Sequence, residues 1–478
     1  MINKQLPYSA NSLYKGNASG SFIAGKRPQE KCGVFGIYNY HGPDNASQMA
    51  FYALLALQHR GQESAGIAYN EDHSVYCQKG MGLVDHLFSA EEMARNSSTQ
   101  AIGHVRYSTT GSSDEANAQP LIAQSRDQSS IALAHNGNLT NTNKLSKMLL
   151  DEGQIFHTTS DTELILTLMY RYRQQGLVEA AKRTMALIKG AYAVVAMNAQ
   201  EMVAFRDPNG FRPLVMGNLG KATVFASETT ALDGLGASFK CDIQPGEIIY
   251  AGPCGITTET SLMGSNHSLC IFEYIYFARP DSIVDGKSVH LIRKKIGSLL
   301  AARVPKGLDA VIPSPDSGVS AAIGLAQKLG IAFDWGIYRN PQLGRTFIKP
   351  SQDERELAVR LKLSPVNSAI KGKKVIIVDD SLVRGTTATV LAKMMKSAGA
   401  KEIHLCIASP PYIHPCYYGI DLPVAGELAL MKNSLVDLSE ILGVDSITFA
   451  EPRDLYEALE IEPTNLCTAC FSGEYPVV

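Results

Sequence analysis

The run Val375–Thr387 carries the residue types of a phosphate-binding site. An apolar strand ends in two carboxylates, Asp379 and Asp380, and a short loop then opens a predicted helix. The unpaired N–H groups and the dipole of a helix N-terminus attract a phosphate, and Gly385 lets the backbone approach it closely. The carboxylates are suited to accept from vicinal ribose hydroxyls or to hold Mg²⁺. The sequence therefore predicts a ribose-phosphate site, and the alternative is an acidic capping turn after a strand.

A second group of residues has the types needed to cleave an amide. The thiol of Cys32 would attack the amide carbon, while Asn136 and the Gly137 N–H would hold the resulting oxyanion. Arg106 would bind a carboxylate through two hydrogen bonds, and Asp161 an α-ammonium group. These residues stand at or near the ends of predicted strands and helices. Together they describe a pocket for an amino acid such as glutamine.

Two other interpretations of Cys32 stay open on the residues alone. A cysteine at the start of a strand is often a small apolar residue with no chemical role. A Cys–His pair is the second alternative, because three histidines lie near these motifs: His59, His104 and His135. The residues by themselves therefore do not identify the base that would activate the thiol.

The remaining cysteines include a C-x-x-C pair, Cys467 and Cys470, near the carboxyl end. Alone, such a pair fits half of a zinc site, a redox pair or half of an iron–sulfur site. The sequence has no second C-x-x-C, which disfavours a zinc ribbon. Nine cysteines in 478 residues are too dilute for a disulfide scaffold and indicate a reduced, cytoplasmic compartment.

The elements that must position Cys32 and the other residues of the predicted amide-cleaving site are short strands with helices between them. Strand patterns cover Gly33–Tyr38, Ser64–Tyr69, Val75–Gln78, Ala101–Arg106, Ile131–His135, Tyr192–Asn198, Glu201–Arg206, Thr223–Ser227 and Glu247–Tyr250. Helical periodicity covers Gln48–Gln58, Asp161–Gln175 and Leu177–Lys189. This mixture predicts an α+β layered domain over residues 32–260.

The elements around the paired carboxylates follow one another in a different order. Helices and strands alternate over Ser288–Arg303, Leu308–Pro313, Ser317–Leu329, Lys374–Asp379, Thr386–Ala398 and Glu402–Ser409. Alternation of this kind is typical of a doubly wound α/β domain with a parallel sheet, predicted here over residues 261–433. Ligands bind such sheets beyond the carboxyl ends of their strands, which is where the carboxylates stand. Residues 434–478 are predicted to form a tail.

Composition and charge exclude several classes of protein. The 44 Lys and Arg balance 46 Asp and Glu, giving a net charge of −2, without the basic excess of a nucleic-acid or membrane-surface protein. The sequence has no apolar run of the roughly 18–20 residues that a bilayer requires. Residues 1–31 are polar and lack the apolar core of a signal peptide. They are therefore either an unstructured tail or a segment that is removed.

The Val375–Thr387 run resembles the signature of type I phosphoribosyltransferases, which use phosphoribosyl pyrophosphate (PRPP). Pro313–Gly318 resembles their pyrophosphate loop, and Gly344–Leu363 resembles the loop that closes over PRPP. The resemblance implies one Mg²⁺ per subunit, at Ser317, Asp379 and Asp380. It implies PRPP binding by Ser317, Arg345, Asp379, Asp380, Ser381, Arg384, Gly385, Thr386 and Thr387.

The set of residues predicted to cleave an amide resembles the active site of the class II glutamine amidotransferases. Their N-terminal-nucleophile domain is an αββα sandwich. In that family the cysteine is the first residue, and its own α-amine acts as the base. An α-amine has a pKa of about 7.7–8.0, which suits this role at neutral pH. The resemblance implies that residues 1–31 are a propeptide removed after Lys31. It also implies the glutamine and oxyanion roles given above for Arg106, Asn136, Gly137 and Asp161.

The two domains in this order resemble a family of enzymes at the first committed step of purine synthesis. The resemblance implies that ammonia from glutamine reaches C1 of PRPP through a channel, giving 5-phosphoribosylamine, glutamate and pyrophosphate. It implies a homotetramer inhibited by purine nucleotides. The iron–sulfur branch of this family binds a [4Fe–4S] cluster through four cysteines, which match Cys270, Cys416, Cys467 and Cys470.

This interpretation has three alternatives. Other class II amidotransferases, such as glucosamine-phosphate or asparagine synthases, lack the Val375–Thr387 run. A ligand-sensing regulator would use the second domain only to bind PRPP or a nucleotide, and near-neutral charge argues against a DNA-binding one. An inactive glutaminase domain retained for regulation stays open, because Cys32 is not the first residue.

Overall fold

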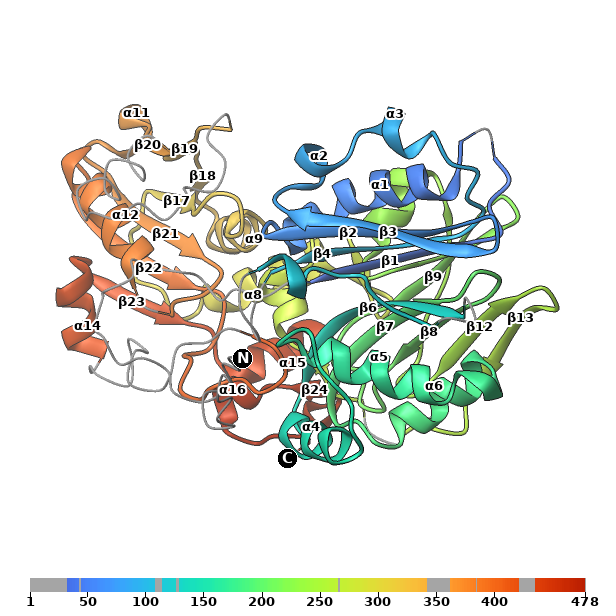
Figure 1. Cartoon of the computed structure of the whole chain (residues 1–478). Helices are drawn as coiled ribbons and strands as arrows, with labels where there is room; N and C mark the ends of the chain where they lie inside the picture. The colour runs from blue at the N-terminus through green and yellow to red at the C-terminus, as the bar shows by residue number, and fades with distance from the viewer. Residues whose placement is uncertain are drawn as a thin grey trace, which may run out of the picture.

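A computed structural model describes residues 32–42, 44–107, 114–125, 129–264, 267–341, 362–383, 385–420 and 435–477. They form two domains that lie side by side (Figure 1). The carboxyl-terminal elements stand where the domains meet: α15 (Pro452–Leu459), β24 (Leu466–Cys467) and α16 (Ala469–Ser472). Within these described ranges, every helix is too short or too polar to span a bilayer.

The first domain contains two antiparallel sheets. The seven-stranded sheet has the order β11 (Ser238–Asp242), β9 (Val215–Leu219), β10 (Ala222–Ala226), β1 (Gly33–Tyr38), β4 (Ala101–Arg106), β2 (Ser64–Glu71), β3 (Ser74–Met81). The six-stranded sheet has the order β13 (Gly255–Glu259), β12 (Ile248–Gly252), β8 (Met202–Arg206), β7 (Gly190–Met197), β6 (Ser130–Leu139), β5 (Leu121–Gln124). Val34 of β1 and Val195 of β7 belong to one buried cluster, so the sheets pack face to face.

Helices cover the outer faces of both sheets (Figure 1). On the seven-stranded sheet lie α1 (Ala46–Leu57), α2 (Val84–Leu87), α3 (Ala90–Met93) and α7 (Thr229–Leu235). On the six-stranded sheet lie α4 (Thr142–Asp151), α5 (Asp161–Arg171) and α6 (Leu177–Met185). Local signals place their starts, because the side chain of Asn45 caps α1 and that of Ser160 caps α5. The layers confirm the predicted αββα sandwich.

The second domain is built on a five-stranded parallel sheet. Its order is β18 (Ala332–Phe333), β17 (Ala310–Pro313), β21 (Lys374–Asp379), β22 (Glu402–Ile407), β23 (Ser446–Phe449). One face packs on α8 (Val289–Leu300), α9 (Val319–Leu329) and α15. The other packs on α11 (Asn367–Ile370), α12 (Thr386–Ser397) and α14 (Leu435–Leu442). The doubly wound prediction is confirmed, and the segment set apart as a tail supplies β23.

Short elements join the domains. A π-helical turn, Glu273–Phe277, leads from the first domain to α8, and a small hairpin follows it: β15 (Ile283–Val284) and β16 (Lys287–Ser288). Strand β14 (Leu269–Cys270) pairs in parallel with β24. A further two-stranded antiparallel sheet pairs β19 (Ile337–Arg339) with β20 (Leu363–Pro365). Single helical turns cover Gln58–Arg60, Glu115–Asn117, Arg173–Gln175 and Pro463–Asn465.

Candidate active sites

Cys32 and Arg106 lie at the same end of two neighbouring strands. Cys32 directly precedes β1, and the antiparallel register pairs Gly33 with Val105 of β4. The Cys32 thiol is 3.6 Å from the carbonyl oxygen of Tyr107, the residue after Arg106. Arg106 is buried, and its guanidinium group is 3.6 Å from the carboxylate of Glu63. The backbones of Cys32 and of the predicted carboxylate-binding residue Arg106 therefore lie at one end of the seven-stranded sheet.

The predicted oxyanion residues reach this end of the sandwich from the other sheet. His104 of β4 and the carbonyl oxygen of His135 in β6 are joined by a hydrogen bond of 3.0 Å. Asn136 follows directly, and its buried Nδ2 has no hydrogen-bond partner among the described residues. Gly137 has φ +145°, and a Cβ there would stand 2.1 Å from the Ala191 carbonyl oxygen. Only glycine fits this position, because both the conformation and the close approach exclude a side chain.

Asp161 is held beside the same strand. It is the first residue of α5, and one carboxylate oxygen accepts the backbone N–H of Leu139 at 2.8 Å. The other oxygen lies 3.9 Å from Nδ1 of His135. Asp161 is almost fully buried, so this anion sits at the helix N-terminus where the dipole favours it. The structure thus links α5 to β6, and β6 to β4, through described contacts.

The histidines weighed as partners of the thiol have other contacts. Nε2 of His59 lies 2.8 Å from a carboxylate oxygen of Glu228, and Nδ1 of His135 lies 3.2 Å from the hydroxyl of Thr162. Burial lowers the pKa of His104 to about 3 and also lowers the pKa of His135, so both are neutral at pH 7. The described contacts of these histidines give no support to a Cys–His pair.

The sequence reasoning missed a buried arginine behind the thiol. The Nε of Arg60 donates to the carbonyl oxygen of Cys32 at 3.0 Å, and the guanidinium group contacts Glu228 and Glu273. The polar turn that contains Arg60, Gln58–Ser64, is the sequence signal that could have found it. Its partners lie 168 and 213 residues away and carry no local signal.

The paired carboxylates lie at the carboxyl end of β21, as predicted. Asp379 and Asp380 are both buried. Ser314 N–H donates to Val378 O at 2.8 Å, which brings the loop after β17 beside them. The hydroxyl of Ser317 is 3.4 Å from Oδ1 of Asp379, so the three residues predicted to bind Mg²⁺ are neighbours.

The segment predicted to bind a phosphate lies at the start of α12. Gly385 adopts φ +79° as its N-cap, and no described side chain caps this end. The hydroxyl of Ser381 donates to the carboxylate of Asp380. Thr387 is half-buried in the first turn. Other predicted PRPP contacts lie outside the described residues: Arg345, Arg384, the side chain of Thr386 and most of Gly344–Leu363.

The four predicted cluster cysteines are neighbours in the fold. Cys270 and Cys467 are register partners, and Cys470 O accepts the N–H groups of residues 413 and 414 beside Cys416. Burial raises the pKa of Cys270 to about 12 and those of Cys467 and Cys470 well above their usual value, and neighbouring thiols raise them further. Among the described residues, however, no three His, Cys, Asp or Glu side chains form a ready-made site for a metal ion.

Comparisons with known proteins agree with both domains. Residues 104–234 match the glutamine amidotransferase domain family, and residues 281–409 match the phosphoribosyl transferase domain family. The chain is 43% identical over 451 residues to amidophosphoribosyltransferase of Bacillus subtilis (strain 168), covering 94% of each. It is 44% identical over 478 residues to the chloroplastic amidophosphoribosyltransferase of Glycine max, covering 100% of this chain and 83% of that one.

A solved structure gives the same result. The glutamine PRPP amidotransferase of B. subtilis, complexed with ADP and GMP, matches with a TM-score of 0.87 and 42% identity, covering 94% of this chain and 98% of that chain. Fold and sites define a glutamine amidotransferase joined to a phosphoribosyltransferase in one chain. The chain belongs to the amidophosphoribosyltransferase family, and it is a glutamine-dependent transferase of purine biosynthesis.

Proposed function

We propose that the enzyme releases ammonia from glutamine at Cys32 and joins it to C1 of PRPP at Asp379 and Asp380. The products are glutamate, pyrophosphate and 5-phosphoribosylamine. The observation that carries this proposal is the pairing of two sites in one packed chain. A thiol at the same sheet end as Arg106 occupies one domain, and paired carboxylates followed by a helix N-terminus occupy the other. The junction segment, residues 273–282, connects the domains through its buried residues Glu273 and Ser282.

At the first site, Cys32 attacks the glutamine amide and Asn136 Nδ2 with the Gly137 N–H stabilises the oxyanion. The unpaired, buried Nδ2 of Asn136 supports this role, because an isolated buried donor is costly unless a ligand completes it. Arg106 binds the α-carboxylate and Asp161 the α-ammonium group. The α-amine of Cys32 is the base, which requires removal of residues 1–31 after Lys31.

At the second site, the start of α12 binds the 5′-phosphate and the carboxylates bind the ribose hydroxyls. The proposed PRPP contacts are Ser317, Arg345, Asp379, Asp380, Ser381, Arg384, Gly385, Thr386 and Thr387. Ser317, Asp379 and Asp380 offer the hard oxygen donors that Mg²⁺ prefers, and their proximity fits one such ion. Bound Mg²⁺ would neutralise charge on the departing pyrophosphate.

We propose a [4Fe–4S] cluster at Cys270, Cys416, Cys467 and Cys470. Three of these thiols, those of Cys270, Cys467 and Cys470, are buried and have raised pKa values, while Cys416 is partly buried beside them. Coordination is the usual way to keep such a donor set as thiolates. Cys270, Cys416, Cys467 and Cys470 would hold the cluster, which would tie the carboxyl-terminal segment to both domains. The described residues contain no ready-made metal-ion site, so the proposal rests on the four-cysteine pattern and on the proximity of these residues in the fold.

The regulation and the oligomeric state of the enzyme are proposed from its membership of the same family. We propose that purine nucleotides bind at the Asp379–Thr387 loop in competition with PRPP, since both carry a ribose phosphate. The B. subtilis structure in complex with ADP and GMP supports nucleotide binding. We propose a homotetramer, and a cytoplasmic location on the ground that none of the nine cysteines, all of them described, forms a disulfide.

One experiment tests the glutaminase proposal directly. The intact mass of protein purified without oxygen is measured together with glutamine-dependent and ammonia-dependent pyrophosphate release. The expected result is a chain that begins at Cys32, and a Cys32→Ala variant that loses glutamine-dependent but retains ammonia-dependent activity. A chain that still carries residues 1–31 and is fully active with glutamine would overturn the N-terminal-nucleophile mechanism.

A further inference from the structure

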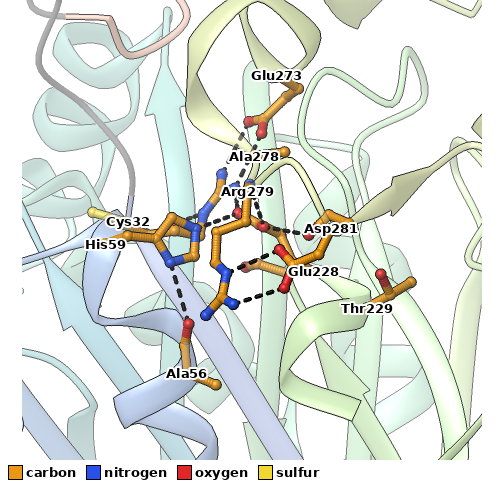
Figure 2. A network of polar contacts seen from close by, with 12 residues as sticks. Cys32, Ala56, His59, Glu228, Thr229, Glu273, Ala278, Arg279 and Asp281 are labelled. Atoms are coloured by element: carbon orange, nitrogen blue, oxygen red, sulfur yellow. Dashed lines mark hydrogen bonds and ion pairs between the residues drawn. The ribbon is translucent and has the colours of Figure 1, made fainter. Parts of the chain in front are cut away.

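The carboxylate of Glu228 lies between the two domains and uses one oxygen toward each. Oε1 accepts from Arg60, and Nε2 of His59 lies 2.8 Å from it, both residues of the turn behind the thiol. Oε2 accepts the backbone N–H of Arg279 at 3.0 Å and the hydroxyl of Ser282 at 2.6 Å. Figure 2 shows Glu228 between His59 and Arg279. This one side chain therefore joins the turn to the segment that leads into the second domain.

On the first-domain side, Arg60 links Glu228 to the proposed nucleophile, Cys32. Arg60 donates through Nε to the Cys32 carbonyl oxygen. Its Nη1 and Nη2 each donate to Glu273 at 3.0 Å, and Nη1 also donates to Glu228. All of these charged side chains are fully buried. The guanidinium group is planar and rigid, so carboxylates on its far edge fix where Nε holds the Cys32 backbone.

On the second-domain side, an arginine of α8 holds the segment that contacts Glu228. Arg293 of α8 donates to the carbonyl oxygens of Tyr274 and Ala278, at 2.6 and 2.9 Å, which fixes the turn before Arg279. Burial lowers the pKa of Arg293 to about 10, and the negative charges of Asp380 and Glu228 partly offset this effect. Arg293 therefore holds the backbone of the turn that leads to Arg279 and Ser282, the two residues that contact Glu228.

The charge of Glu228 is maintained in spite of its burial. Burial by itself would raise its pKa, but His59 and Arg60 hold the pKa well below its usual range. An ionised carboxylate without solvent needs all of its acceptor sites satisfied, and here four donors satisfy them. Four donors around one anion leave little freedom for the groups that it joins.

We propose that Glu228 is a positioning residue for the glutamine reaction. Through Arg60 it sets the backbone of Cys32, and through Arg279 and Ser282 it ties that backbone to the segment leading to the PRPP site. The inference rests on the proposed role of Cys32. Because Glu228 acts on the thiol and its α-amine rather than on the glutamine-binding residues, its loss lowers turnover with glutamine more than affinity for glutamine.

The test compares Glu228→Gln with a matched control. Glutamine keeps the shape but offers one acceptor oxygen, so either the Arg60 side or the Arg279 side loses its partner. The control is Asp281→Asn, which lies in the same segment but pairs only with the exposed side chain of Arg279 in the described contacts. Steady-state pyrophosphate release is measured with glutamine and, separately, with ammonia.

The expected result for Glu228→Gln is a loss of about 100-fold in kcat with glutamine, as for a misplacement of about 1 Å in a catalytic group. The KM for glutamine and the ammonia-dependent rate stay within about twofold, and Asp281→Asn matches the wild type. An equal loss with glutamine and ammonia would show a general structural defect and overturn the proposal. No loss with glutamine would overturn it as well.

A second variant keeps the proposal testable if Glu228→Gln does not fold. Ser282→Ala removes one donor to Oε2, and the expected loss is about tenfold in kcat with glutamine only, as for one hydrogen bond to a charged group. An unchanged rate would overturn the link to the second domain. Cys32→Ala separates the two claims: if it retains glutamine activity, the proposed nucleophile is wrong, whereas if it is inactive while Glu228→Gln is normal, only the positioning role is wrong.

Discussion

Cys270 and Cys467 are register partners in the two-residue parallel pair of β14 and β24. They are 197 residues apart in the sequence, so this pairing attaches the carboxyl-terminal segment to the domain junction. The neighbouring loop also reaches the first domain, because Nδ2 of Asn138 donates to Tyr417 O at 2.9 Å. The ring of Tyr418 stacks on Phe211 with 4.2 Å between centroids. The cysteine group thus stands where both domains and the chain end meet.

This placement predicts that the cysteines hold the domains together through a bound cluster. A Cys467→Ser variant purified without oxygen is expected to lose most of its iron and sulfide, and its apparent melting temperature is expected to fall by a few degrees. Cys254→Ser, at an exposed position, is the control and should retain both. Iron analysis and calorimetry provide the measurements. Full iron content in Cys467→Ser would contradict the assignment.

The carboxylate of Asp379 is expected to serve PRPP and not glutamine. Asp379→Asn removes the charge beside Ser317, and loss of hydrogen bonds to a charged group costs about 1.5–3 kcal/mol, or roughly 10- to 150-fold in affinity. The KM for PRPP should rise by this factor with either glutamine or ammonia as nitrogen donor. Asp334→Asn, at a surface ion pair, is the control. A defect seen only with glutamine would be inconsistent with the assignment.

The loop after β17 depends on a close approach that only glycine allows. A Cβ at Gly318 would stand 2.1 Å from Val378 O, so Gly318→Ala must push the Ser317 loop away from Asp379. We expect PRPP-dependent turnover to fall at least tenfold and stability to fall by about 1–3 kcal/mol. Gly234→Ala is the matched control, because its nearest neighbour is 3.5 Å away in helix α7, where alanine is favoured by about 0.5–1 kcal/mol. Kinetics and urea unfolding distinguish the two variants.

The buried His104 predicts a pH dependence of stability. Its folded-state pKa is about 3, below the unfolded value near 6.5, because burial disfavours the charged ring. The unfolded chain therefore takes up a proton first, and the stability present above pH 6.5 is lost as pH falls toward 3. The limiting slope for this group is about 1.4 kcal/mol per pH unit.

This dependence is measured by urea unfolding between pH 7.5 and pH 5. A His104→Gln variant is expected to show a shallower decline with acidification than the wild type. His86→Gln, at an exposed position in α2, should follow the wild-type curve. If His104→Gln and the wild type declined in parallel, another group would be responsible.

Much of the fold was predictable because its elements carry strong local patterns. The ends of β1, β4 and β21 coincide with the predicted strands, since each is an apolar run that stops at a polar residue. The strands that escaped prediction include β11 and β13, whose side chains are mostly exposed. An exposed edge strand lacks the alternation of buried and polar residues on which sequence prediction depends.

The sequence by itself determined which chemistry each domain carries: a thiol with Arg106, Asn136 and Asp161, and paired carboxylates before a glycine-opened helix. These motifs are local, because a strand end and the following turn are contiguous in the chain. The tertiary structure alone decided how the sites connect. Arg60 contacts Glu273 across 213 residues, and a buried ion pair of this kind arises only when the packed domains exclude water from both charges.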